Sequence, residues 1–517
     1  MLNIAIILES AAREHPARDA LVFEGQRIGY GELERRAGRV AANLAAAGIG
    51  RGDHVALACL NRPEFVIAYY GILKTGATVV TVSALLKARE IAFQLADSDA
   101  VALIAYGGEV GGLGTEVRKA AALTPTCRHV WFIEGGSGDR DFGELLGGEG
   151  TVVAADTDEH DTAVILYTSG TTGSPKGAEL THANIMMNVV AIARERTVAT
   201  DRPVSLVALP LFHVFAQTCL MHTGLYMGAA LVLMQRFSAR EAIDLIVAEQ
   251  ITSFSGVPTM FRAMLDDPGL TEDDVAAVRR VVKATGSGGS SLAPELQKRF
   301  AERFGVPMID GYGCTETSPV ACFLHEGATY RPGSCGQAAF GVQLRVVDGD
   351  GRVLAPGEVG ELCVKGHCVM KGYYKRPDDT ARAIRDGWYH TGDLARIDED
   401  GYVFIVGRLK ELIIRGGFNV YPAEVEAVLM THPAVGMAAV LGVPHETHGE
   451  EIMAVVSPRQ GMSLDPDELR DWARNEMAAY KYPRLIEVRE HLPLGPTGKV
   501  QKRDLIPARQ QGPGTWQ

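Results

Sequence analysis

The sequence is short of basic residues, of aromatic residues and of long apolar runs. Lys and Arg number 51 against 63 Asp and Glu, which gives a formal net charge of -12, and aromatic residues make up 7% of the chain. A nucleic-acid-binding protein normally shows a basic stripe, so we expect no nucleic-acid partner. The acidity itself is typical of a soluble protein.

Membrane and export signals are also missing. No apolar run approaches the roughly 20 residues that cross a bilayer. The longest, residues 225–234, contains Gly228 and predicts a buried strand together with the segment that leads into it. The first residues, MLNIAIILESAAREHP, lack a positive leader and a small-residue cleavage site. The cysteines form no C-x-x-C pair, which favours reduced thiols over a zinc site. We therefore expect a cytoplasmic protein without an integral membrane span, as a monomer or homodimer.

At 517 residues the chain is too long for one core, so we expect two or more domains. Through the first 400 residues, apolar strand-like runs such as HVALACL and AVALIAY alternate with helical patterns such as PEFVIAYYGILKTG and AREAIDLIVAEQ. This alternation predicts an α/β fold of layered subdomains with largely parallel sheets. QLRVVDGDGRVL and ARIDEDGYVFIVG each predict two strands around a turn, hence a small β-rich subdomain.

A new unit begins after Gly407. We expect a helix over residues 422–430, strands at MAAVLGV and EIMAVVSP, a helix near residues 469–477 and a last strand at LIEVRE. These elements make a small α+β domain of independent size. The predicted division is a large domain over residues 1–407, a hinge at 408–411 and a small C-terminal domain over 412–517.

The strongest local signal is the run TSGTTGSPKG at residues 168–177, which follows the apolar strand AVILY. Backbone N–H groups and hydroxyls in such a loop can surround phosphate oxygens, and Lys176 adds a positive charge. It is not the P-loop of nucleotide triphosphatases, because Pro175 precedes the lysine and Gly177 follows it. The alternative is a plain flexible turn. The expected phosphate-binding residues are Thr168, Ser169, Gly170, Thr171, Thr172 and Lys176.

Six blocks, in order along nearly the whole chain, resemble the adenylate-forming enzymes, which comprise acyl-CoA synthetases, luciferases and the adenylation domains of peptide synthetases. The blocks are YTSGTTGSPKGAELTHAN (167–184), ALPLFHVFAQ (208–217), DGYGCTET (310–317), YHTGDLA (389–395), GRLKELIIRGGFNVYPAEVE (407–426) and PLGPTGKVQKRDL (493–505). The resemblance implies ATP-dependent conversion of a carboxylic acid to acyl-AMP with release of pyrophosphate, then transfer to coenzyme A. ATP, Mg²⁺ and coenzyme A are the expected cofactors and cosubstrates.

The resemblance also implies the nucleotide site. Tyr312 is expected against the adenine face, Thr315 on the α-phosphate and Glu316 on Mg²⁺. Asp393 is expected to accept from the ribose hydroxyls, and Arg408 to make a second ribose or phosphate contact. The same match adds the nucleotide-binding residues Gly289, Asp310, Gly311 and Gly313. An isolated Tyr or Glu at such positions would otherwise be explained as surface solvation.

The catalytic lysine implied by the resemblance is Lys499, in PTGKV. An ammonium between the carboxylate and the α-phosphate lowers their repulsion most in the transition state. Alone, such a lysine would be explained as a solvated turn residue. His213 is expected beside the carboxylate, with a hydrogen-bonded core histidine as the alternative. The expected acyl pocket consists of His213, Phe215, Ser287, Gly288, Gly313 and Val320, and the expected catalytic residues are Lys499, His213, Glu316 and Thr315.

For the second half-reaction, relatives rotate a small mobile C-terminal domain, and the turning point corresponds to Lys410. Rotation would bring Gly416, Gly417 and Phe418 to the site, where glycine admits a pantetheine arm. The alternative is that these glycines only form a bend between two strands.

The block LPLFHVFAQT has no Asp to pair an amino group, and the wall segments 213–215, 287–290 and 319–322 contain no Arg or Lys for a second carboxylate. A fatty, aryl or alicyclic monocarboxylic acid is therefore expected. At Ala216 and Ser290 the sequence departs slightly from the usual pattern of acyl-CoA synthetases, so the sequence does not determine the shape of the pocket. An amine or carrier protein as acceptor, and a non-catalytic binding protein, are the alternative functions.

Overall fold

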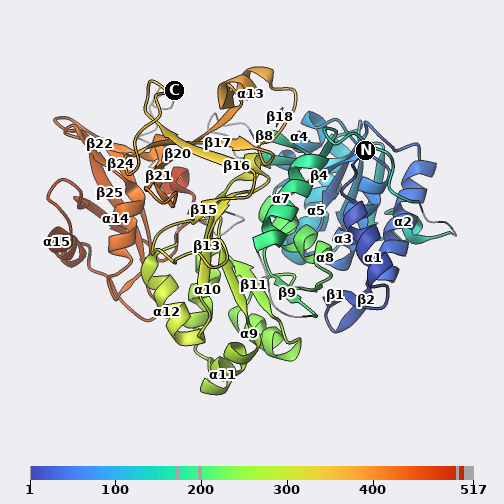
Figure 1. Cartoon of the computed structure of the whole chain (residues 1–517), viewed down its shortest axis with the longest axis horizontal. Coiled ribbons are helices and arrows are strands. Elements are labelled where there is room, and N and C mark those ends of the chain that lie inside the picture. The colour runs from blue at the N-terminus through green and yellow to red at the C-terminus, as the bar shows by residue number, and fades with distance from the viewer. Residues whose placement is uncertain are drawn as a thin grey trace.

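The computed structural model describes residues 2–148, 150, 152–168, 175–195, 201–290, 292–495 and 500–505. Three sheets make up the larger part of the molecule, and a fourth belongs to a small C-terminal unit at one side (Figure 1). The expected α/β class, with a large N-terminal and a small C-terminal domain, is confirmed.

The first sheet has seven strands in the order β18-β8-β7-β4-β3-β5-β6. Its centre is parallel, and near one edge β8 runs antiparallel to both of its neighbours, β7 and β18. Its strands are β3 (His54–Ala58), β4 (Thr78–Thr81), β5 (Ala100–Tyr106), β6 (His129–Ile133), β7 (Thr162–Thr168), β8 (Lys176–Thr181) and β18 (Gly372–Tyr373). The phosphate-binding run therefore joins two antiparallel neighbours, since Thr168 pairs with Lys176.

The second sheet has nine strands in the order β15-β14-β13-β12-β11-β9-β10-β1-β2, again parallel at the centre. Its strands are β1 (Asp19–Phe23), β2 (Gln26–Gly29), β9 (Val204–Val207), β10 (Ala230–Leu233), β11 (Ser253–Gly256), β12 (Ala284–Ser287), β13 (Met308–Gly313), β14 (Val320–Phe323) and β15 (Gln337–Ala338). The strand expected within residues 225–234 is confined to β10, because α8 (Thr223–Tyr226) occupies the start of that run.

Helices cover these two sheets, and several begin where the sequence supplies a cap. Pro63 occupies the first turn of α3 (Pro63–Lys74). The Thr271 and Ser238 side chains accept from backbone N–H groups of α11 (Glu272–Val281) and α9 (Ala239–Ala248), respectively. The remaining helices of this part are α1 (Ile6–Glu14), α2 (Tyr30–Ala46), α4 (Ala88–Asp97), η1 (Val110–Gly112), α5 (Leu113–Leu123), α6 (Gly143–Leu146), α7 (His182–Glu195), η2 (Phe215–His222), α10 (Pro258–Leu265), α12 (Pro294–Phe304), η3 (Thr315–Thr317) and α13 (Pro377–Ala383). Of these, η2 is a π-helix, a form that is frequent at functional sites.

The β-rich subdomain is a five-stranded antiparallel sheet. It consists of β16 (Val342–Val347), β17 (Gly360–Gly366), β19 (Ile384–Arg385), β20 (Trp388–Ile397) and β21 (Val403–Arg408). The hairpin predicted at ARIDEDGYVFIVG is present as β20 and β21. At QLRVVDGDGRVL only β16 forms, and the second strand is reduced to a single bridge between Val347 and Val353.

The C-terminal unit follows η4 (Leu409–Glu411). It contains β22 (Ile413–Arg415), β23 (Phe418–Val420), α14 (Pro422–Leu429), β24 (Val435–His445), β25 (Gly449–Pro458), α15 (Pro466–Glu476), β26 (Leu485–Val488) and η5 (Lys502–Leu505). Its apolar clusters begin at Ile413, whereas the clusters of the larger part end at Ile405. Within the described ranges, no helix is both long and apolar enough to span a membrane.

Candidate active site

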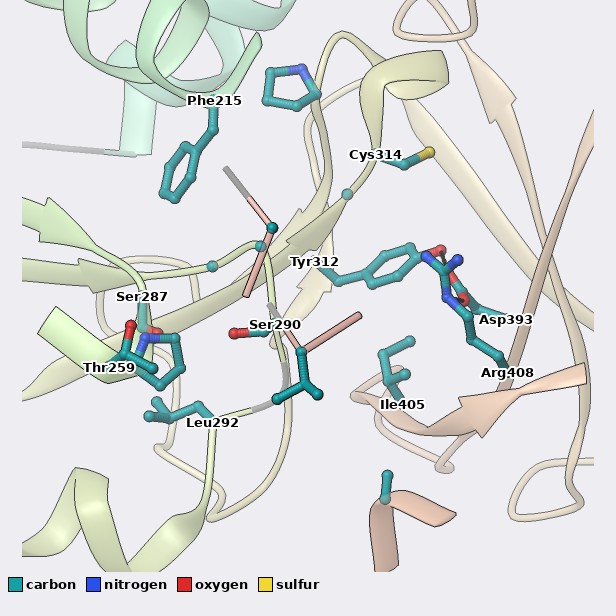
Figure 2. A pocket seen from close by; sticks show the side chains of 18 of the residues that line it. Phe215, Thr259, Ser287, Ser290, Leu292, Tyr312, Cys314, Asp393, Ile405 and Arg408 are labelled. Atoms are coloured by element: carbon teal, nitrogen blue, oxygen red, sulfur yellow. Dashed lines mark hydrogen bonds and ion pairs between the residues drawn. The ribbon is translucent and has the colours of Figure 1, made fainter. Parts of the chain in front are cut away.

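One large cavity lies where the nine-stranded sheet, the β-rich subdomain and the C-terminal unit meet (Figure 2). Residues from the ends of β12, β13, β20 and β21 and from the start of η2 line it. The described residues that were expected in the nucleotide and acyl sites are therefore brought together from segments as far apart as Thr168 and Arg408. Ser169, Gly170, Thr171, Thr172 and Lys499 lie outside the described residues.

Asp393 is the centre of a hydrogen-bonded cluster at one wall of this cavity. The Tyr312 hydroxyl donates to Asp393 Oδ2 over 2.6 Å, and Arg408 Nε lies 3.1 Å from Asp393 Oδ1. Figure 2 shows the Tyr312 side chain extending toward the pair formed by Asp393 and Arg408. Burial, and then the Asp393 charge, raise the pKa of the Tyr312 hydroxyl well above its usual range, so this hydroxyl stays a donor. Asp393 and Arg408 face one another because they are paired across β20 and β21.

The turn that leads into Asp393 is held by Glu361 of β17. Glu361 Oε1 accepts from the Gly392 N–H over 3.0 Å, and its Oε2 lies 2.8 Å from His390 Nδ1. The Thr391 hydroxyl donates to the Leu362 carbonyl at 2.8 Å and accepts from the Asp393 N–H at 3.0 Å. The sequence reasoning missed Glu361, since it lies about 30 residues before the HTGD block and carries no local signal.

Glu361, Cys363 and His390 also form the one group of metal-ligand types found among the described residues. Cys363 Sγ lies 3.4 Å from His390 Nδ1, the atom that already contacts Glu361. Arg345 interacts with the same thiol, and its charge disfavours a cation there. We therefore interpret this group as a hydrogen-bonded support for the turn and not as a metal site.

Glu316 is a buried carboxylate whose hydrogen-bond partners are hydroxyl groups. It is 8% exposed, and its Oε1 accepts from Thr168 Oγ1 at 3.3 Å and from the Tyr373 hydroxyl at 2.9 Å. In the described part of the chain no Lys, Arg or His forms an ion pair with it. A buried, uncompensated carboxylate beside the phosphate-binding run suits a hard cation such as Mg²⁺.

Lys176 lines the cavity, and in this arrangement its ammonium group is paired with a carboxylate. Its Nζ lies 2.7 Å from Asp379 Oδ1, and Arg382 contacts the same carboxylate at 2.6 Å. The two cations lower the pKa of Asp379, so the carboxylate stays charged and competes with a phosphate for Lys176.

Asp310 and Ser287 are neighbours on β13 and β12, and both carry buried oxygens without a partner. They are register partners, so their side chains share one face of the sheet. Among the described groups, neither Asp310 Oδ1 nor Ser287 Oγ has a hydrogen-bond partner. Cys335 Sγ lies 3.7 Å from the other Asp310 oxygen, and burial raises the pKa of this carboxyl to about 7. Unpartnered buried polar atoms at a cavity wall fit a ligand with polar edges.

The acyl end of the cavity is formed around Phe215. A Cβ added at Gly288 would lie 3.2 Å from the Phe215 ring, so the ring lies over this glycine. Gly288 therefore faces the opposite way from Ser287, which separates Ser287 from the Phe215 wall. Gly313 is required by packing, because a Cβ there would lie 1.8 Å from the Pro319 carbonyl oxygen. His213 Nδ1 accepts from the Phe215 N–H at 3.3 Å.

The remaining expected residues either line the cavity without a contact described above or lie away from it. Thr315 begins η3 and, with Gly289, Gly311 and Val320, lines the cavity. Gly416 and Gly417, with φ of 56° and 85°, form the two-residue turn between β22 and β23. This is the bend that was the alternative explanation, and neither glycine nor Phe418 is among the residues that line the cavity.

Comparison with known proteins agrees with this arrangement. The AMP-binding enzyme family matches residues 8–374, and the AMP-binding enzyme C-terminal domain matches residues 424–499. The chain is 35% identical over 495 residues to a feruloyl-CoA synthase of an Amycolatopsis species, with 96% of each chain covered. It is 32% identical over 528 residues to a long-chain-fatty-acid–CoA ligase of Bacillus subtilis, with 97% of this chain and 93% of the relative covered. It also resembles the ATP-bound structure of MatB from Rhodopseudomonas palustris, with a TM-score of 0.89 and 30% identity over 98% of both chains. This chain belongs to the AMP-binding enzyme family and is an AMP-forming acid–thiol ligase.

Proposed function

We propose that this ligase activates a hydrophobic monocarboxylic acid and transfers it to coenzyme A, with the cavity residues in the roles given below. The observation that carries the proposal is that the Asp393 cluster, the buried Glu316 carboxylate and the apolar wall at Phe215 all line one cavity. A sugar-binding carboxylate, a cation-binding carboxylate and an acyl pocket are what acyl-adenylate formation requires.

For the nucleotide, Tyr312 lies against the adenine face and Asp393 accepts from the ribose hydroxyls, with Arg408 holding the carboxylate. Asp310, with the unpartnered Ser287 hydroxyl beside it, reads the polar edge of the base. We thus move Ser287 from the acyl pocket to the nucleotide side, because it faces away from Phe215. Gly289, Gly311, Gly313 and Thr315 line the path to the α-phosphate, and Glu316 would hold Mg²⁺, which neutralises charge on the departing pyrophosphate.

In the first step a carboxylate oxygen of the acid attacks the α-phosphorus, the P–O bond to the β-phosphate breaks, and pyrophosphate leaves. Lys499 stabilises the negative charge that gathers between the two anions. In the second step the thiolate sulfur of coenzyme A attacks the acyl carbonyl carbon and AMP leaves. His213, fixed at the start of η2, lies beside the carboxylate, and Phe215, Gly288 and Val320 enclose the acyl group and exclude water.

The C-terminal unit, residues 412–517, supplies different residues to the two steps by turning about Lys410. Gly495 and Val500, which flank Lys499, line the cavity, whereas the turn at Gly416 and Gly417 does not. The present orientation therefore suits adenylation, and a rotation would bring the turn and Phe418 to the pantetheine path.

Pyrophosphate release and product masses test the proposal directly. Incubated with ATP, Mg²⁺ and a hydrophobic acid, the enzyme should release pyrophosphate, and adding coenzyme A should give one thioester per AMP. Amide formation from supplied amines, with no thioester, would instead identify an amide-forming ligase. The eight free cysteines are compatible with a reducing compartment, so a cytoplasmic location is part of the proposal.

A further inference from the structure

One face of the nine-stranded sheet is packed, and the other continues the active-site cavity. On the packed face, Leu206 of β9 and Phe254 of β11 are buried among α9–α12. The residues beside them in sequence, Ser205 and Ser253, are half-exposed and line the cavity. Alternate residues of a strand point to opposite faces, so the described residues leave space over the open face of these central strands.

Strand β12 has the same alternation and gives the length of this space. Thr285 also borders the cavity, but its side chain is buried and its hydroxyl donates to the Pro307 carbonyl at 2.9 Å. Ala284 and Gly286 are half-exposed and line the cavity, on the face that Gly288 continues under the Phe215 ring. From Gly288 back to Ala284 the strand covers about 13 Å, at roughly 3.3 Å per residue.

Two helices form the walls of this space. Ile192 of α7 and Leu220 of η2 line the same cavity. The buried Asn188 holds α7 in place, since its Nδ2 donates to the Val320 carbonyl at 2.9 Å and its Oδ1 accepts from the Val320 N–H at 3.3 Å. Figure 1 shows the labels of α7 and α8 near the middle of the molecule, between the strands of the two larger sheets in this view.

The floor of the space is formed by small side chains, whereas its entrance carries the Phe215 ring. At the far end, Ser205 Oγ and Ser253 Oγ are hydrogen-bonded to one another over 2.7 Å, so each hydroxyl has a partner. A compact ring next to the carboxylate would stop at Phe215 and leave this floor uncovered. A flexible chain passes an aromatic ring more easily and fills a long, narrow space.

We propose that the strip formed by Ser205, Ser253, Ala284 and Gly286, here called the acyl floor, holds the far end of an extended acyl group. The substrate is then a medium- or long-chain monocarboxylic acid, and a compact aromatic acid such as benzoic acid is a poor one. This inference rests on the proposed acyl-CoA ligase function and names the class of its acid.

Bulk placed along the acyl floor tests the inference, because it should shorten the longest acid accepted. Wild type, Ala284→Phe and Gly286→Val are compared by kcat/KM for acyl-CoA formation with hexanoic, decanoic and hexadecanoic acids and with benzoic acid. Wild type should prefer the longer chains. Ala284→Phe should lower kcat/KM for hexadecanoic acid by about 100-fold. Gly286→Val, nearer the reaction end, should also affect decanoic acid. Activity with hexanoic acid reports that each variant is folded, and Arg280→Phe, on the exposed side of α11, is the matched control for added bulk.

The inference is overturned if both acyl-floor variants keep the wild-type chain-length profile, or if wild type uses benzoic acid better than the longer chains. Should no acid at all give pyrophosphate and thioester, the proposed ligase function fails instead. The two failures are thus distinguishable in one set of assays.

Discussion

Asp310 is buried beside the Cys335 thiol, and burial raises the pKa of its carboxyl group to about 7. In the unfolded chain the same carboxyl group ionises at about pH 4. Between these values the folded state holds a proton that the unfolded state has lost, so this residue lowers stability by about 1.4 kcal/mol per pH unit as the pH rises. Below about pH 4 the ionisation of Asp310 does not lower the free energy of unfolding, and above about pH 7 the whole loss is present.

Asp310→Asn keeps the shape of the side chain and removes the ionisation. We expect the nucleotide-free variant to unfold at a higher temperature than wild type at pH 8, and this difference to shrink as the pH falls toward about 4, where the ionisation cost disappears. Thermal unfolding at several pH values measures the difference, with the exposed Asp350→Asn as control. A difference that does not change with pH would show that Asp310 is not the group that titrates.

Glu361 holds the turn that leads into Asp393, so in the proposed nucleotide site it would be a positioning residue. Glu361→Ala removes both of its hydrogen bonds to that turn, and we expect KM for ATP to rise about tenfold, while KM for the acid stays unchanged. Glu361→Gln retains an acceptor for the Gly392 N–H and should recover part of the loss. Glu358→Ala, in the exposed connection just before β17, is the matched control. Equal increases in both KM values would mean that Glu361 only stabilises the fold.

At the scale of single residues, the sequence predicted which motif residues lie in one cavity better than it predicted which residues support them. Tyr312, Asp393 and Arg408 were expected in one site because each lies in a motif, and the structure joins them by hydrogen bonds. The sequence could not predict to which face of β12 the Ser287 side chain points, because this depends on where the strand begins. Nor could it find Glu361, because its partner residues come from another strand of the sheet.

At the scale of elements, periodicity predicted the long segments well. AVALIAY and AREAIDLIVAEQ became β5 and α9, since alternation and the i, i+3, i+4 spacing are local properties. The π-helix η2 was not predicted, because an apolar run has no feature that distinguishes π from α turns. The second strand at residues 351–354 was wrong, since only one bridge supports it.

The turn at Gly416 and Gly417 determines how the coenzyme A path can be tested. Both residues have φ in the left-handed region, which a two-residue hairpin turn of type I′ requires. A bulky residue at either position would therefore strain the hairpin as well as obstruct a ligand. Phe418 is a better target, because its ring is 57% exposed and stacks on Tyr480 with 4.9 Å between centroids.

Phe418→Ala should slow thioester formation from supplied acyl-AMP and coenzyme A by about tenfold, because an exposed aromatic contact is lost. Acyl-AMP formation in a single turnover, followed by pyrophosphate release, should stay unchanged. Leu485→Ala, at another exposed apolar residue of the C-terminal unit that does not line the cavity, is the control. Loss of both steps to the same extent would place Phe418 outside the coenzyme A path.

At the scale of the whole molecule, the described residues that follow Lys499 are attached to the C-terminal unit. Lys502, three residues after Lys499, pairs with Glu411 at 2.6 Å and with Glu426 of α14 at 2.8 Å. The contact with the larger part is weaker: Arg262 donates to the Gly436 carbonyl at 3.4 Å. The short segment η4, with Lys410 at its centre, connects the two bodies.

Substitution of Lys410 tests whether both half-reactions need a rotation at this point. Proline fixes φ near about -65° and restricts the preceding residue, so Lys410→Pro should hold the unit in one orientation. Because the residues that flank Lys499 line the cavity in the present orientation, we expect acyl-AMP formation to persist and thioester formation to fall by about 100-fold. Lys410→Ala removes the same side chain without restricting the backbone and should keep both rates. The two half-reactions are measured separately, by pyrophosphate release in a single turnover and by thioester formed from supplied acyl-AMP. If Lys410→Pro keeps both rates near wild type, the turning point lies elsewhere. Loss of adenylation with thioester formation retained would mean that the rotated orientation is the one proline selects.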